Sequence, residues 1–143
     1  MDRRHFLTGL ALSAGLAASG ARAAAAPTLK FRDMYSRGTQ LSEAAEALVG
    51  QRISMLGYMA PPLKPEVKFF VLTKLPMATC PFCNDAADWP TDLVVAYADE
   101  PLQVYRYADA LRVEGMFETG VFTDPDTGFV SLARLRGVQY SRV

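Results

Sequence analysis

Short apolar and β-branched runs, separated by turns rich in proline and glycine, dominate the sequence after residue 50. Residues 52–58, 67–73 and 93–97 each have the length and composition of a strand. Pro61 and Pro62 follow the first of these runs and end it, because proline cannot donate a hydrogen bond to a neighbouring strand. We therefore expect the second half of the chain to be mainly β.

A final hairpin is predicted near the C-terminus. Residues 111–116 alternate between apolar and more polar positions, as expected for a strand. Residues 124–128 (Asp-Pro-Asp-Thr-Gly) have the composition of a turn. Residues 129–135 are then expected to return alongside residues 111–116. Residues 102–108 could form a further strand or an irregular edge. About five short antiparallel strands predict a small antiparallel barrel resembling the oligonucleotide/oligosaccharide-binding fold (OB-fold).

One short N-terminal helix is expected before the strands. Apolar residues recur at helical spacing between positions 41 and 48, Ser42 suits the N-cap, and Gly50 stands where the helix should end. Residues 24–40 show no sustained period and are predicted to form a linker or irregular arm. A single small barrel domain is then expected over residues 41–143.

The first 23 residues have the pattern of a twin-arginine export signal. Arg3 and Arg4 precede a weakly apolar run at 10–18, which is too short to span a bilayer. Small residues at alternate positions favour cleavage near Ala23. An ordinary secretory signal is the alternative, since Asp2 replaces the Ser or Thr usual before the two arginines. Both alternatives predict export to the periplasm.

Removing this signal changes the inventory of reactive groups. The sole histidine of the sequence, His5, would be lost, which excludes Ser-His-Asp and Cys-His catalysis and the common histidine zinc sites. The whole chain has 15 basic and 15 acidic residues, and the remainder would carry a net charge of about −2. Evenly mixed charge argues against a nucleic-acid partner, which would require clustered Lys and Arg.

The motif Cys80-Pro81-Phe82-Cys83 is the most reactive constellation in the remaining sequence. Two thiols at this spacing can close a disulfide, bind a soft metal or exchange disulfides with another protein. A thioredoxin-like fold is the rival architecture for such a motif. It fits poorly, because Pro90 interrupts the sequence where that fold requires a long helix.

The metal hypothesis depends on which other ligands are near the two thiols. Copper(I) accepts two thiolates, Cys80 and Cys83, and the thioether of Met77, Met59 or Met55 could assist. Zinc needs four ligands, so Asp85 and Asp88, or a second chain, would have to complete the site. Packing in the core is the default expectation for all of these methionines.

Two further groups of polar residues have weaker functional interpretations. Arg134 and Arg136 share one face of the last predicted strand, where an anion patch is conceivable, but solvent exposure is the expected role. Tyr97 and the other tyrosines could form a ligand platform on the barrel, with ordinary packing as the default.

The sequence also resembles a family of small exported bacterial proteins of unknown function. The resemblance is carried by residues 50–61 (GQRISMLGYMAP), by 69–72 (FFVL), by the cysteine-bearing loop and by 113–115 (VEG). It covers roughly residues 50–135. The resemblance implies a barrel and a periplasmic accessory role, often associated with transport systems for metals or lipoproteins.

These observations predict a periplasmic accessory or binding protein whose loop containing Cys80 and Cys83 binds copper, zinc or a protein partner, such as a component of a transport system. One alternative is a thiol-disulfide oxidoreductase with the same two cysteines as catalytic residues. Another is a purely structural module with a loop disulfide. Neither nucleic-acid binding nor integration into the membrane after cleavage is expected.

Overall fold

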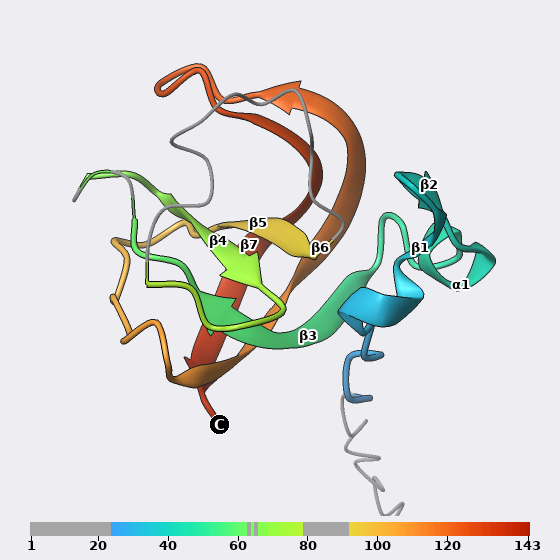
Figure 1. Cartoon of the computed structure of the whole chain (residues 1–143), viewed down its shortest axis with the longest axis horizontal. Coiled ribbons are helices and arrows are strands. Elements are labelled where there is room, and N and C mark those ends of the chain that lie inside the picture. The colour runs from blue at the N-terminus through green and yellow to red at the C-terminus, as the bar shows by residue number, and fades with distance from the viewer. Residues whose placement is uncertain (1–23, 63, 65, 79–91) are drawn as a thin grey trace, which may run out of the picture.

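A computed structural model describes residues 24–62, 64, 66–78 and 92–143. In this part of the chain, five strands form a mixed sheet whose hydrogen bonds run in a ring, in the order β3-β4-β5-β7-β6 (Figure 1). The predictions of a mainly β protein and of one short helix are confirmed. The ring strands are β3 (Arg52–Met59), β4 (Phe69–Thr73), β5 (Leu93–Tyr97), β6 (Ala110–Thr123) and β7 (Val130–Arg142).

The sheet is mixed, and the prediction of an entirely antiparallel arrangement was wrong at one pair of strands. β5 and β7 run parallel, with Val95 opposite Arg134, whereas the other four pairs in the ring are antiparallel. The alternation of apolar residues predicts which face of a strand is buried, but not which strand lies beside it. Strand direction cannot alternate all the way around a ring of five, so when four pairs are antiparallel the fifth must be parallel.

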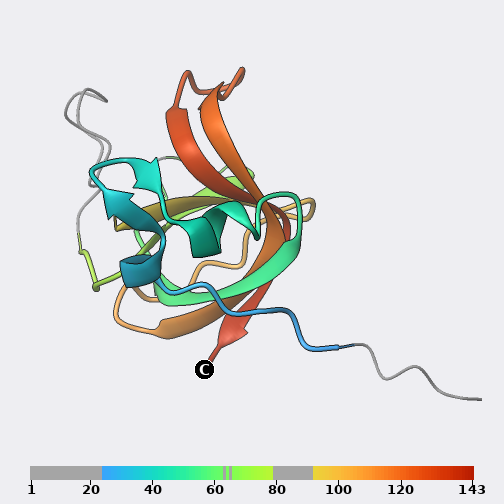
Figure 2. The same ribbon diagram turned by 90° about the vertical axis from the view of Figure 1, so that its right-hand side faces the viewer.

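The predicted strands agree closely with the observed ones, except in the last hairpin. β5 has the predicted bounds, and β3 and β4 differ from prediction by one or two residues. β6 and β7 extend well past the predicted 111–116 and 129–135, and their ends beside the connecting turn project beyond the other strands (Figure 2). Residues 102–108 contain no strand.

The predicted helix is present but shorter than expected. α1 spans Glu43–Glu46, and its N-cap Ser42 accepts a hydrogen bond from the Ala45 N–H at 3.1 Å. The following residues continue with tighter turns, in which the Leu48 N–H donates to the Ala45 carbonyl and Gly50 adopts a positive φ of 80°. The apolar spacing continues into these tighter turns, and for that reason it predicted a longer helix. None of the described helices is long and apolar enough to cross a membrane.

Residues 24–40, predicted as a linker or irregular arm, contribute to the core of the structure. Leu29, Phe31 and Met34 are buried in the main hydrophobic cluster. The Leu29 N–H donates to the Ser54 carbonyl at 2.9 Å, so this segment also pairs with an edge of β3. The 3-10 helix η1 (Phe31–Asp33), the small sheet of β1 (Tyr35–Arg37) and β2 (Gln40–Leu41), and α1 gather on one side of the ring (Figure 2).

Two glycines permit the closest approaches between neighbouring strands. A Cβ atom on Gly57 would lie 2.6 Å from the Thr73 carbonyl oxygen, and one on Gly115 would lie 2.8 Å from the Arg136 carbonyl oxygen. Large apolar side chains fill the interior beside them. The fully buried ones include Phe70, Phe117, Met34, Ile53, Met55, Met59, Leu72, Leu93, Leu111, Leu135, Val94, Val95 and Val113.

Candidate ligand pocket

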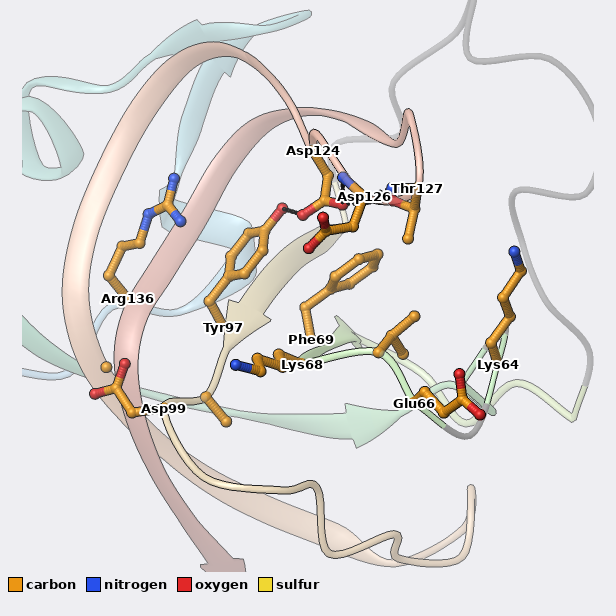
Figure 3. A pocket seen from close by; sticks show the side chains of 13 residues that line it. Lys64, Glu66, Lys68, Phe69, Tyr97, Asp99, Asp124, Asp126, Thr127 and Arg136 are labelled. Atoms are coloured by element: carbon orange, nitrogen blue, oxygen red, sulfur yellow. Dashed lines mark hydrogen bonds between the residues drawn. The ribbon is translucent and has the colours of Figure 1, made fainter.

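A pocket of about 490 Å³ lies at one end of β4 and β5 (Figure 3). Its volume falls within the range of small-molecule sites in proteins. Four separate stretches of sequence line it: the residues leading into β4, the end of β5, the turn between β6 and β7, and the middle of β7. The lining residues are Lys64, Glu66, Val67, Lys68, Phe69, Tyr97, Ala98, Asp99, Asp124, Asp126, Thr127, Arg136 and Gly137.

Aromatic rings make the apolar floor of the pocket. The Phe69 ring lies 5.2 Å from the Tyr97 ring and 5.4 Å from the Phe129 ring, measured between centroids, in tilted arrangements. Such geometry is favourable for aromatic pairs. Phe69 is buried and Tyr97 is half-buried, so the floor is packed against the core at Phe69 and partly open to solvent at Tyr97.

The turn between β6 and β7 forms one wall, and Asp124 fixes its shape. One carboxylate oxygen, Oδ1, accepts hydrogen bonds from the Asp126 N–H at 3.1 Å and from the N–H and hydroxyl of Thr127, both at 2.9 Å. The other oxygen, Oδ2, accepts from the Tyr97 hydroxyl at 3.1 Å. A single buried carboxylate therefore organises the turn and fastens it to β5 (Figure 3).

Opposite pKa shifts accompany this hydrogen bond. Burial raises the pKa of Tyr97 to about 12, and the Asp124 carboxylate adds to the shift. Burial acts to raise the pKa of Asp124 as well, but the hydrogen bonds from Thr127, Tyr97 and Asp126 outweigh it and lower the pKa of that carboxyl. At neutral pH the pair is thus a phenol donating to a carboxylate.

Two arginines on β7 share one carboxylate behind this wall. The Nε atoms of Arg134 and Arg136 donate to the same oxygen, Oε2 of Glu118, at 3.1 and 3.0 Å. Arg134 Nη1 also donates to the Gly120 carbonyl at 2.8 Å. Burial acts to raise the pKa of Glu118, but hydrogen bonding and the charges of both arginines lower it overall.

The two arginines differ in exposure, which corrects the expectation that both lie in solvent. The Arg134 side chain is only 7% exposed, whereas that of Arg136 is 34% exposed. The Arg136 guanidinium carbon lies 4.5 Å from the ring centroids of both Tyr97 and Phe122. Cation–π contacts of this kind attract the guanidinium charge to both aromatic rings. Arg136 therefore connects the ion-paired cluster to the pocket.

Charged side chains surround the mouth of the pocket. Within the described residues, no ion pair or hydrogen bond engages their charged groups. All of them are exposed. We call these five residues the rim charges: the cations are Lys64 and Lys68, and the anions are Glu66, Asp99 and Asp126.

The predicted metal-binding residues are largely outside the described part of the chain. Cys80, Cys83 and Asp85 lie there, as does the predicted signal at residues 1–23, whereas Met77 is described and half-buried. Within residues 24–62, 64, 66–78 and 92–143, no group of three or more His, Cys, Asp or Glu side chains is placed to hold a metal ion. Binding of copper or zinc stays a prediction.

Sequence analysis singled out Tyr97 and Arg136 but missed the residues that bond to them or pack against them. The Asp-Pro-Asp-Thr-Gly sequence predicted a turn, and its first aspartate, Asp124, could have been assigned as the acceptor that stabilises it. The roles of Glu118 and Phe69 depend on strand register and had no comparable local signal.

The described residues form a mainly β protein, with five strands whose hydrogen bonds run in a ring and a pocket at one end of β4 and β5. The structure is similar to that of a DUF3299 family protein from Pseudomonas aeruginosa PAO1, with a TM-score of 0.56 and 14% sequence identity. The similarity covers 84% of this chain and 97% of the other and supports a relationship in fold to a bacterial protein. No protein-family model matches the sequence, and neither does any curated protein.

Proposed function

We propose that this protein is a periplasmic binding protein that holds a small ligand in the pocket between residues 64–69 and the turn at 124–127. The observation that carries the proposal is a concave site with an aromatic floor, a wall fixed by Asp124 and charged groups that no described partner engages. Small-molecule sites in proteins are concave and combine apolar walls with polar groups that fix the orientation of the ligand. The periplasmic location rests on the predicted export signal at residues 1–23.

We further propose that the five-stranded ring is a barrel of the OB type. Barrels of that type bind ligands with the loop between their first and second strands and the loop between their fourth and fifth. In this chain the corresponding segments are residues 60–68 and 124–129, between β3 and β4 and between β6 and β7. Both segments contribute to the pocket, which supports the proposed location of the ligand site.

The fixed geometry of the pocket favours binding without a large rearrangement. The turn is held by three hydrogen bonds to Asp124 Oδ1, and Arg136 is held by Glu118 and by two aromatic rings. A site whose walls are already ordered loses less conformational entropy when the ligand binds.

Filling the pocket with a larger side chain tests this proposal. We would titrate the isotopically labelled chain with amino acids, dipeptides, disaccharides and inorganic phosphate, and follow backbone amide shifts by NMR. At least one probe should shift amides at residues 64–69 and 124–128, and Val67→Trp should abolish the response. Val104→Trp, at an exposed valine outside the pocket, is the matched control. No response to any probe would contradict the proposal.

The cysteine motif supports a second candidate function, binding of copper, zinc or a protein partner through Cys80 and Cys83. Its support is the two-residue spacing of the thiols and the predicted export of the chain. Equilibrium dialysis of the reduced protein against Cu(I) and Zn(II) should give stoichiometric binding that Cys80→Ser removes. Dialysis without binding, together with cysteine-dependent insulin reduction, would instead favour the oxidoreductase alternative. A permanently bridged pair without either activity would favour a structural disulfide.

A further inference from the structure

The rim charges surround an apolar floor, and this combination points to one class of ligand. We propose that the pocket binds a zwitterion with an apolar group, of the amino-acid or short-peptide class. The inference rests on the proposed function, because it names the ligand of the same pocket.

The charged groups inside and behind the pocket already have hydrogen-bond partners. Asp124 accepts four hydrogen bonds through its two oxygens. Arg136 donates to Glu118 at 3.0 Å and packs against two rings. Recognition of a charged ligand therefore falls to the rim charges, which have both signs: two lysines and three carboxylates.

The positions of Lys68 and Asp126 suit a ligand with separated charges. In the view of Figure 3 their side chains lie on opposite sides of Phe69, one from the segment before β4 and the other from the turn. Their backbones are fixed: the Lys68 carbonyl accepts from the Ala98 N–H at 2.8 Å, and the Asp126 N–H donates to Asp124. A ligand carboxylate would pair with Lys68 and a ligand ammonium with Asp126, above the apolar floor.

Ligands of other charge types fit this rim less well. A phosphate-rich polyanion would meet three carboxylates, and a simple cation would meet two lysines. A neutral ligand such as a sugar would cover rim charges without compensating them, and removing water from an uncompensated charge is costly. A zwitterion supplies both opposite charges, while its apolar part contacts Val67, Phe69 and Tyr97.

Capping the ends of a dipeptide tests the class of ligand. We would compare leucylphenylalanine with its N-acetylated, C-amidated and doubly capped forms, using NMR titration of the full chain. Each single cap should weaken binding about two- to fivefold, as expected for the loss of one exposed ion pair. A disaccharide serves as the neutral probe and inorganic phosphate as the anionic probe.

Charge-removing variants assign each end of the ligand to a residue. In Lys68→Met, amidating the C-terminus of the dipeptide should no longer weaken binding, because the ion pair with Lys68 is already lost. In Asp126→Asn, acetylating the N-terminus should no longer weaken binding for the same reason. Lys74→Met and Glu46→Gln, at exposed charged residues outside this pocket, are the matched controls and should preserve both penalties.

The outcomes separate this inference from the proposed function. If the doubly capped dipeptide or the disaccharide binds the pocket as tightly as leucylphenylalanine does, the zwitterion class is wrong and the pocket is retained. The same holds if phosphate alone shifts the pocket amides. If none of the probes shifts them, both the ligand class and the proposed function are wrong.

Discussion

The two ends of the β4–β5 pair differ in how they relate to the candidate sites. At the end marked by Phe69 and Tyr97, four separate stretches of the chain meet and form the pocket. At the end marked by Thr73 and Leu93, the chain leaves for the segment that contains both cysteines. The Lys74 N–H donates to the Asp92 carbonyl at 3.0 Å, so the residue after β4 is joined to the residue before β5.

This comparison shows why one site was visible in the sequence and the other was not. Cys80 and Cys83 are neighbours along the chain, so their spacing suggests chemistry before the fold is known. Phe69 and Asp124 are 55 positions apart in the numbering and become part of one pocket only through strand pairing. Experiments that perturb one end at a time can establish how independent the two sites are.

The largest effect is expected from Gly57→Ala, at the Thr73 end. The new Cβ would lie 2.6 Å from a backbone oxygen, so strands β3 and β4 would have to separate. We expect the free energy of unfolding to fall by about 3 kcal/mol, as measured by urea denaturation. Amide shifts should be larger near Thr73 than near Tyr97.

Gly120→Ala is the control for Gly57→Ala. Gly120 has a positive φ of 101° and no atom within 4 Å of the added Cβ, so it tests backbone strain without a steric clash. It should cost about 1 to 2 kcal/mol, the strain of a side chain at positive φ. Equal losses for the two variants would show that the close approach at Gly57 is not important for stability.

A smaller loss is expected from Glu118→Gln, at the pocket end. The buried Arg134 would lose the carboxylate that compensates its charge, although solvent access to Glu118, which is 40% exposed, reduces the effect. Chemical denaturation should show a loss of about 2 kcal/mol. Asp33→Asn, which removes an exposed ion pair with Arg32 at 3.7 Å, should change stability by less than about 0.5 kcal/mol. A similar change in both variants would contradict the assigned role of Glu118.

Tyr97→Phe should have a smaller effect still, concentrated in the turn. It removes the hydroxyl that donates to Asp124 but keeps the ring on the pocket floor. We expect a loss of about 1 kcal/mol and faster hydrogen exchange of the Thr127 amide. Tyr107→Phe, at an exposed tyrosine, should change neither quantity. Unchanged exchange at Thr127 in Tyr97→Phe would show that the turn does not depend on β5.

The final prediction concerns the contribution of Asp124 to acid sensitivity. The pKa of this carboxyl is lowered in the folded protein, so the unfolded chain takes up the proton first as pH falls. Its contribution to stability should be present above its ordinary pKa of about 4 and be lost as pH falls through the lowered value. Thermal unfolding of the natural chain and Asp124→Asn between neutral and acid pH should therefore converge on acidification. A widening difference would contradict this assignment.

The sequence by itself determined the local elements of this protein. Alternating and continuous apolar runs located β3, β4 and β5 to within two residues, and Ser42 located the start of the helix. These signals depend on neighbouring residues, because side-chain periodicity and capping act over one or two turns of backbone. For the same reason the cysteine motif and the turn at 124–128 could be recognised before any fold was known.

Only the tertiary structure decided which distant residues meet. The parallel pairing of β5 with β7, the burial of Arg134 and the assembly of the pocket all depend on register between strands far apart in sequence. A local pattern predicts that a residue faces inward or outward, but the partner it finds there is set by how the whole ring closes. Arg134 illustrates the reason: a charged residue at a strand position is expected in solvent until a carboxylate on the adjacent strand, Glu118, stabilises it in the interior.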